Sequence, residues 1–224
     1  MTLRTATLAG IAIALIATSC GGGGRGDAPV ETPTQEPTPT RFAAGVIIEG
    51  GEDPDLPGVH VDLQGIYDGF YGNSDGNTTA PHVTQDVDYE ADGNSNPPAG
   101  GPHWAGACGN VPSEAPQFCG PAPWGIFREP WQPETLIHNM EHAGAVVWYN
   151  TTDQAVIDDL EDLVNDLRGP VVLTPYFDME DEHVAVTTWA RIDKFPVSEY
   201  SRERVEEFLD VHNCRFNPEN LPDC

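Results

Sequence analysis

The chain has 224 residues, and its 36 acidic and 10 basic side chains give a formal net charge of −26. A surface this acidic repels nucleic acid and anionic lipid, so we exclude a nucleic-acid-binding function and expect cations to be attracted. The length allows one medium domain or two small ones.

The first residues predict a lipoprotein signal peptide. Residues 1–4 are a short positive start, residues 5–17 are almost wholly apolar, and the sequence ATSC ends at Cys20. The apolar run of about thirteen residues is short for a transmembrane helix, which needs about twenty. We therefore predict that residues 1–19 are removed. Lipidated Cys20 would then hold the protein to the membrane on the outer, extracytoplasmic face of the cell.

A tether and one domain follow the signal peptide. Residues 20–41 are rich in Gly, Pro and Thr, a composition typical of an extended linker. Residues 42–224 predict a single globular domain, with an irregular, β-containing acidic region at 42–101 and an α+β core at 102–224. Within the acidic region, the sequence VHVDLQGIYDGFYG at 59–72 predicts the strands of a hairpin, and NSDGN at 73–77 predicts a turn.

The sequence of the core predicts a series of helices and strands. A short helix opens at Pro133, and a long amphipathic helix is predicted over 153–168. The predicted strands are 143–149, 170–177 and 184–192. The last two would pair antiparallel across the acidic turn DMEDEH at 178–183, and a final helix would end near His212. This order predicts a two-layer α+β domain with a small, mostly antiparallel sheet packed by helices. A thioredoxin-like order is the alternative.

Four cysteines remain beyond the anchor. Cys108, Cys119, Cys214 and Cys224 form an even set in an exported chain, so disulfides are expected. Local pairs, 108 with 119 and 214 with 224, are the simplest arrangement. Bonds from the 108–119 loop to the C-terminal pair would also satisfy the spacing, and the choice stays open.

The sequence ETLIHNMEHAGAVVWYN at 134–150 contains the pattern H-x-x-E-H. In a helix, its His138, Glu141 and His142 fall within about 100° of one another, so their side chains could reach one ion. Upstream, the Pro/Gly-rich NPPAGGPHW would fix His103 as another imidazole. The candidate metal ligands are therefore His103, His138 and His142, with Glu141, Met140 or His82 as a further ligand or supporting group. Histidine with methionine suits copper, and histidine with carboxylate suits zinc.

Two other functions compete with a metal-binding module. In a metal-dependent hydrolase, Glu141 would be the general base for a metal-bound water. A helix that ends at once in Gly144 and a strand argues against that enzyme geometry. In a structural or partner-docking domain, the histidines and Glu141 would form a hydrogen-bonded cluster without metal.

Several segments together resemble a known family. These are NPPAGGPHW, a later Cys-Gly, LIHNMEHAGAVVWYN, VVLTPYF and VAVTTWARIDKF, and they resemble the bacterial domain of unknown function 3105 over about residues 80–212. The matching polar residues are His82, His103, His138, Glu141 and His142. Two features depart from the family pattern: Ala143 stands where glycine is expected, and extra residues, including Cys119, follow Cys108. The resemblance implies an exported domain organised around these polar residues and supplies no activity.

Overall fold

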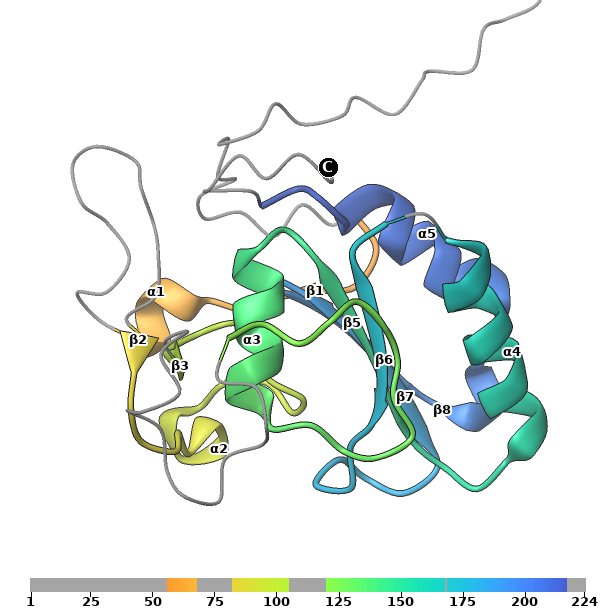
Figure 1. Cartoon of the computed structure of the whole chain (residues 1–224), viewed down its shortest axis with the longest axis horizontal. Helices are drawn as coiled ribbons and strands as arrows, with labels where there is room; N and C mark the ends of the chain where they lie inside the picture. The colour runs from red at the N-terminus through yellow and green to blue at the C-terminus, as the bar shows by residue number, and fades with distance from the viewer. Residues whose placement is uncertain (1–55, 68–81, 105–119, 168, 217–224) are drawn as a thin grey trace, which may run out of the picture. The chain divides into compact units, whose positions relative to one another are not determined.

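A six-stranded mixed sheet forms the centre of the domain, with strand order β1-β8-β7-β5-β6-β4, and a two-stranded sheet, β2-β3, lies apart from it. The computed structural model describes residues 56–67, 82–104, 120–167 and 169–216 (Figure 1). The strands are β1 (Val59–His60), β2 (His82–Val83), β3 (His103–Trp104), β4 (Gly125–Ile126), β5 (Ala145–Asn150), β6 (Val171–Pro175), β7 (His183–Thr188) and β8 (Arg191–Pro196). The helices are α1 (Leu63–Ile66), α2 (Tyr89–Asp92), α3 (Pro133–Glu141), α4 (Gln154–Asp166) and α5 (Arg202–His212), with a short 3-10 helix at Val197–Glu199.

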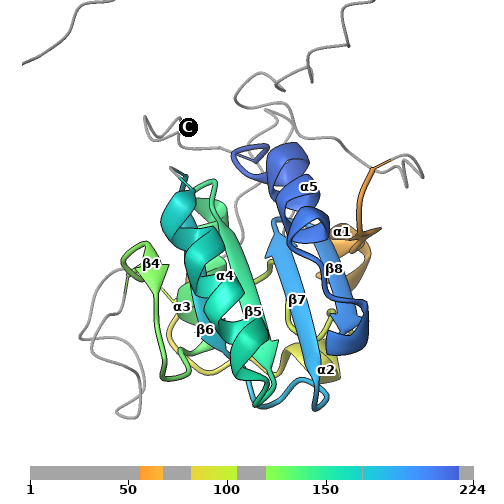
Figure 2. The same ribbon diagram turned by 90° about the vertical axis from the view of Figure 1, so that its right-hand side faces the viewer.

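Helices cover both faces of the large sheet. Side chains alternate along a strand, so Val147 of β5 faces α4 and α5, whereas Val146 and Trp148 face the core around α3. Figure 2 shows α4 and α5 next to each other on one face, with α3 behind the sheet. The predicted α+β class is confirmed, and α3, which carries the H-x-x-E-H pattern, packs on the opposite face from the two longer helices.

The predicted pairing of 170–177 with 184–192 is wrong. Strand β5 lies between β6 and β7, and it pairs parallel with β6 and antiparallel with β7. The acidic turn therefore crosses the end of β5 instead of closing a hairpin. Asn150, the last residue of β5, donates a hydrogen bond to the Met179 carbonyl at 2.7 Å and so holds the turn in place.

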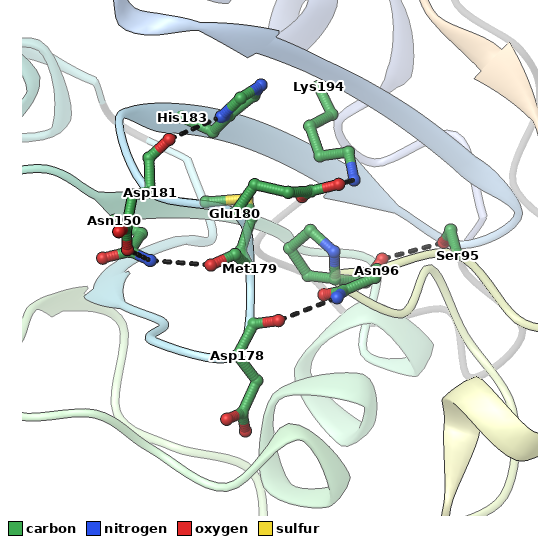
Figure 3. A network of polar contacts seen from close by, with 10 residues as sticks. Ser95, Asn96, Asn150, Asp178, Met179, Glu180, Asp181, His183 and Lys194 are labelled. Atoms are coloured by element: carbon green, nitrogen blue, oxygen red, sulfur yellow. Dashed lines mark hydrogen bonds and ion pairs between the residues drawn. The ribbon is translucent and has the colours of Figure 1, made fainter.

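Polar contacts occupy the acidic turn (Figure 3). The Asn96 amide donates to the Asp178 carbonyl at 2.8 Å, and the Lys194 ammonium donates to the Glu180 carboxylate at 2.9 Å. Both groups come from other parts of the chain. The turn thus joins the segment before β3 to the strand β8, which gives its residues a structural role.

Two segments that were predicted as continuous strands are interrupted in the structure. The segment 184–192 breaks after Thr188 and resumes in β8, because Ala190 takes a left-handed conformation at φ 62° and its N–H bonds the Ala99 carbonyl at 2.7 Å. In the predicted hairpin at 59–72, β1 has only two residues and α1 follows. Asp62 caps α1 by accepting the Gly65 N–H at 2.9 Å, which favours a helix at that point.

The signal peptide, the tether and the NSDGN turn lie outside the described residues, so they stay predictions. Cys20, Cys108, Cys119 and Cys224 also lie outside them, and the disulfide pairing likewise stays a prediction. Among the residues that the structure describes, none of the helices has the length and apolar character needed to cross a membrane.

Helix α3 ends in a left-handed turn that leads directly into β5. The Gly144 N–H bonds the Asn139 carbonyl at 3.0 Å and the Ala143 N–H bonds the Met140 carbonyl at 3.1 Å, the two bonds of a Schellman motif. Ala143 has φ 69°, a conformation that favours glycine. This explains why glycine is expected at the position after the H-x-x-E-H pattern.

Gly144→Ala is expected to destabilise the protein by about 1–3 kcal/mol. A Cβ at this position would collide with the Trp124 ring and lie 2.8 Å from the Pro170 carbonyl oxygen, which belongs to the backbone and cannot easily move. Urea unfolding measures the change. As a control, Ala143→Gly removes a Cβ from a strained position and should stay within about 1 kcal/mol of the wild type. Equal stability of Gly144→Ala and wild type would contradict this packing.

His212 is expected to make the protein sensitive to acid. Burial, with Arg215 and Arg191 nearby, lowers its pKa to about 4, while its Nε2–H donates to the Pro57 carbonyl at 2.8 Å. The unfolded state takes up this proton near pH 6.5, so stability is complete above that pH and falls by up to about 3 kcal/mol as the pH drops toward 4. Thermal unfolding across pH 7 to 4 should show a shallower loss in His212→Gln, whose amide keeps the bond to Pro57. A loss equal to that of the wild type would contradict the assignment.

Candidate metal centre

Helix α3 supplies two of the polar side chains. All its eight residues from Glu134 to Glu141 are buried, although five of them are polar, so it is a core helix with internal polar contacts. His138 and Glu141 are three residues apart and therefore lie on one side of the helix. They face the two-stranded sheet, where β3 contacts α3.

A glycine turn brings His103 to the same place. Gly100 and Gly101 have φ of 130° and 126°, and a Cβ on Gly100 would lie 2.6 Å from the Leu63 side chain. Only glycine allows this backbone to pass so close to its neighbours. The turn places His103 at the start of β3, where its side chain is fully buried.

The pairing of strands β2 and β3 places His82 next to His103. Strands β2 and β3 are parallel, and His82 is the register partner of His103, so the two side chains project to the same side of the small sheet. The segment after β2 is fixed by the Trp104 indole N–H, which donates to the Gln85 carbonyl at 3.0 Å. Unlike His103, His82 has a side chain that is 48% exposed.

Four ligand atoms converge where these elements meet. One atom each from His82, His103, His138 and Glu141 lies within 4.8 Å of the others. The Glu141 Oε2 lies 2.9 Å from the His103 Nε2 and 3.6 Å from the His82 Nε2. Tetrahedral zinc, with bonds of about 2.0–2.1 Å, needs ligand atoms about 3.3 Å apart. The observed separations lie on both sides of this value, and the cluster could hold a metal ion after small side-chain shifts.

Two backbone carbonyls set the orientation of the buried imidazoles. The His103 Nδ1 lies 3.0 Å from the Gly101 carbonyl oxygen, and the His138 Nδ1 lies 3.0 Å from the Trp104 carbonyl oxygen. A carbonyl oxygen can only accept, so each Nδ1 carries a hydrogen and donates it. In the neutral tautomer, each Nε2 then presents a lone pair, and a metal-binding histidine has this arrangement.

The electrostatics favour a neutral imidazole at His138 and an ionised carboxylate at Glu141. Burial, with the nearby His103 and His142, lowers the pKa of His138 to about 3, so this imidazole is neutral at physiological pH. For Glu141, burial raises the pKa, but the hydrogen bond from His103 and the neighbouring histidine charges outweigh it and hold the pKa below its ordinary value. The site therefore presents a carboxylate beside a neutral imidazole.

The His103–Glu141 contact itself requires a positive group. With its Nδ1–H donated to Gly101, the neutral His103 has only an acceptor at Nε2, and the Glu141 carboxylate is also an acceptor. A proton or a cation must lie between these two atoms. Among the residues that the structure describes, the buried Glu141 Oε1 has no hydrogen-bond partner, so the carboxylate retains an unused acceptor there.

The other two candidate ligands, His142 and Met140, are not members of the converging group. His142 is the C-cap residue of α3, where the helix already ends, and its ring packs edge-on against His138 at 4.8 Å between centroids. It is not among the four converging residues, which include His82 and Glu141 instead. Met140 is fully buried in the hydrophobic core.

Sequence reasoning missed Asn139, which lies between the ligands along α3. Its side chain is fully buried; its Oδ1 accepts the Ala122 N–H at 2.7 Å and its Nδ2 donates to the Ala122 carbonyl at 2.8 Å. One amide thus fixes a distant loop to the helix that carries two cluster residues. The sequence did contain a signal for this residue. Asn139 is a polar residue between a motif histidine and an apolar methionine in a helix.

The fold and site define an α+β domain built around a buried cluster of histidines and a glutamate that could hold a metal ion. The family model described as protein of unknown function DUF3105 matches residues 82–224, so the chain belongs to that family. The match begins at His82 and contains all four cluster residues, which confirms the resemblance seen in the sequence. No curated protein and no solved structure matches the chain.

Asn139→Leu is expected to cost about 2–4 kcal/mol, because it leaves the buried N–H and carbonyl of Ala122 without partners. Asn96→Leu is the matched control. It breaks one exposed hydrogen bond, to Asp178, and should cost less than about 1 kcal/mol. Urea unfolding of both variants measures the difference, and equal losses would contradict the role given to Asn139.

Proposed function

We propose that this protein is a metal-binding module that holds one zinc or copper ion with His82, His103, His138 and Glu141. The observation that carries the proposal is the anchoring of two buried imidazoles by the carbonyls of Gly101 and Trp104. It leaves the Nε2 of each ring as a lone-pair donor, in a cluster with a carboxylate whose Oε1 has no hydrogen-bond partner among the described residues. A cation satisfies all these acceptors at once.

The donor set narrows the choice of ion. Three imidazole nitrogens and one carboxylate oxygen suit Zn(II) or Cu(II), whereas Cu(I) prefers sulfur ligands. The sulfur of Met140 lies in the core with Leu136 and Ile137, so it does not add to this donor set. We therefore propose a divalent ion, and the acidic surface would raise its local concentration.

The location of the module is also proposed from the sequence. The apolar start, Cys20 and the Gly/Pro/Thr-rich tether favour a lipoprotein that holds the domain outside the cell membrane. In that setting the module would meet metal ions in the extracytoplasmic space. Membrane attachment would run through lipidated Cys20, and the acidic surface argues against nucleic acid as a partner.

The two alternatives differ from this proposal in the role of Glu141. A hydrolase with Glu141 as base would need the carboxylate near a bound water, but its Oε2 lies among the ligand atoms, which favours a ligand role. A purely structural cluster would use the His103–Glu141 hydrogen bond with a proton in place of the ion. Metal content and Glu141→Gln distinguish these cases.

The protein purified without a histidine tag is expected to bind about one Zn(II) or Cu(II) per chain, measured by elemental analysis after dialysis. His138→Ala should abolish this binding, because it removes a buried ligand. His183→Ala is the control, since His183 lies on β7 in contact with the Asp181 carbonyl, outside the cluster. Unchanged stoichiometry in His138→Ala would overturn the proposal.

Glu141→Gln separates the metal-binding role from the structural one. The glutamine amide can donate to the His103 Nε2, so the metal-free variant keeps the hydrogen bond and should fold. It loses the charged ligand, so its metal affinity should fall by about a hundredfold or more. A saturating ion should raise the Tm of the wild type by several degrees and that of the variant far less. Equal Tm increases would contradict a ligand role for Glu141.

A further inference from the structure

The four cluster residues are not equally enclosed. His103, His138 and Glu141 are buried, with at most 6% of each residue exposed. The His82 side chain is 48% exposed. Solvent therefore reaches the cluster on the side of His82, whereas the other three residues form its enclosed wall.

The four residues also differ in how firmly they are held. The rings of His103 and His138 each donate a hydrogen bond to a backbone carbonyl, and Glu141 belongs to a buried helix. Within the described segments, no hydrogen bond fixes the His82 ring. Its contacts there are the Glu141 carboxylate at 3.6 Å and the faces or edges of His103 and His138.

The backbone that carries His82 is weakly fixed at this point. Strand β2 has two residues, and among the described strands its partner is the two-residue strand β3. A ladder this short contributes little stability by itself. The next fixed points along the chain are the Gln85 carbonyl, bonded to Trp104, and the Val87 N–H, bonded to Glu134. His82 can therefore withdraw without breaking the contacts that hold His103, His138 and Glu141.

We propose that His82 holds an exchangeable coordination position, through which the ion enters and leaves the site. This inference rests on the proposed metal-binding function and deepens it. Structural zinc sites are closed by four firmly held ligands, whereas sites that exchange or activate a ligand keep one open position. Here, three firmly held residues form the permanent part of the site, and His82 is the ligand that an external donor replaces.

The exchange is a ligand substitution that needs no oxidant and no proton transfer. An incoming donor forms a bond to the ion with its lone pair, while the bond from the ion to the His82 Nε2 breaks. His82 leaves as neutral imidazole, and the charge on the ion is unchanged. We expect the external ligand to have the same chemistry as the His82 side chain, which is an imidazole. A histidine of a partner protein that receives or delivers the ion would supply it.

The test uses the protein loaded with Co(II), whose visible spectrum reports its coordination, and with Zn(II) for release to a chromogenic chelator. His82→Ala is expected to keep about one ion per chain and to release it about tenfold faster or more than the wild type. Millimolar imidazole should shift the Co(II) spectrum of His82→Ala and slow its release. The wild type and His183→Ala should need a far higher imidazole concentration for the same spectral shift, because the attached His82 competes for the position.

Two results would overturn the inference. One is release from His82→Ala at the wild-type rate with no response to imidazole, which would mean that His82 is not a ligand. The other is complete loss of binding in a folded His82→Ala, which would make His82 part of the permanent site. His82→Asn replaces His82→Ala if circular dichroism shows that the alanine variant is unfolded. Absence of ion binding by the wild type would instead overturn the proposed function itself.

Discussion

Two hydrogen bonds from buried imidazoles to backbone carbonyls determine what the centre of this protein can do. The carbonyls of Gly101 and Trp104 fix the protonated nitrogens of His103 and His138. A donor at either carbonyl position would reverse the ring tautomer and point a hydrogen at the cluster instead of a lone pair. The chemistry of the site is thus set by main-chain atoms, and main-chain geometry is set in turn by the Gly-Gly-Pro-His turn and the short strand after it.

The large sheet supports this arrangement from one side. Helix α3 packs on β5, a central strand with β7 on one side and β6 on the other, and the turn that joins helix and strand is only three residues long. The small sheet completes the site from the other side and places His82 and His103 in register. The four converging residues therefore come from three separate stretches of chain, and each stretch is fixed by different interactions.

Local sequence patterns predicted the parts of the fold that depend on local chemistry. The amphipathic helix α4, the short helix at Pro133 and the apolar strand β5 follow from periodicity and end signals. The pairing of β6 with β5 did not follow, because a short acidic turn is typical of a hairpin and the crossing over β5 depends on Asn150. The break at Ala190 was missed for a similar reason, since its partner is the carbonyl of a distant residue.

The candidate site likewise has parts that follow from local sequence and parts that depend on distant contacts. Helical spacing predicted that His138, Glu141 and His142 lie on one side of a helix. The rigid Pro/Gly turn predicted that His103 is held in a fixed position. Spacing could not show that α3 ends at His142, nor that strand pairing would bring His82 from far upstream. Strand register and helix termination therefore decide that His82, and not His142, belongs to the converging group.

The Schellman turn has a consequence for how variation in this family would act. Glu141 is four residues before Ala145, where the central strand starts, and the turn between them is closed by Trp124 and the Pro170 carbonyl. Because this turn is short and tightly packed, we expect a substitution that displaces β5 relative to β6 to displace the Glu141 carboxylate as well. Residues of the sheet core would then set the position of the carboxylate without touching it, so that fold stability and the geometry of the cluster would change together.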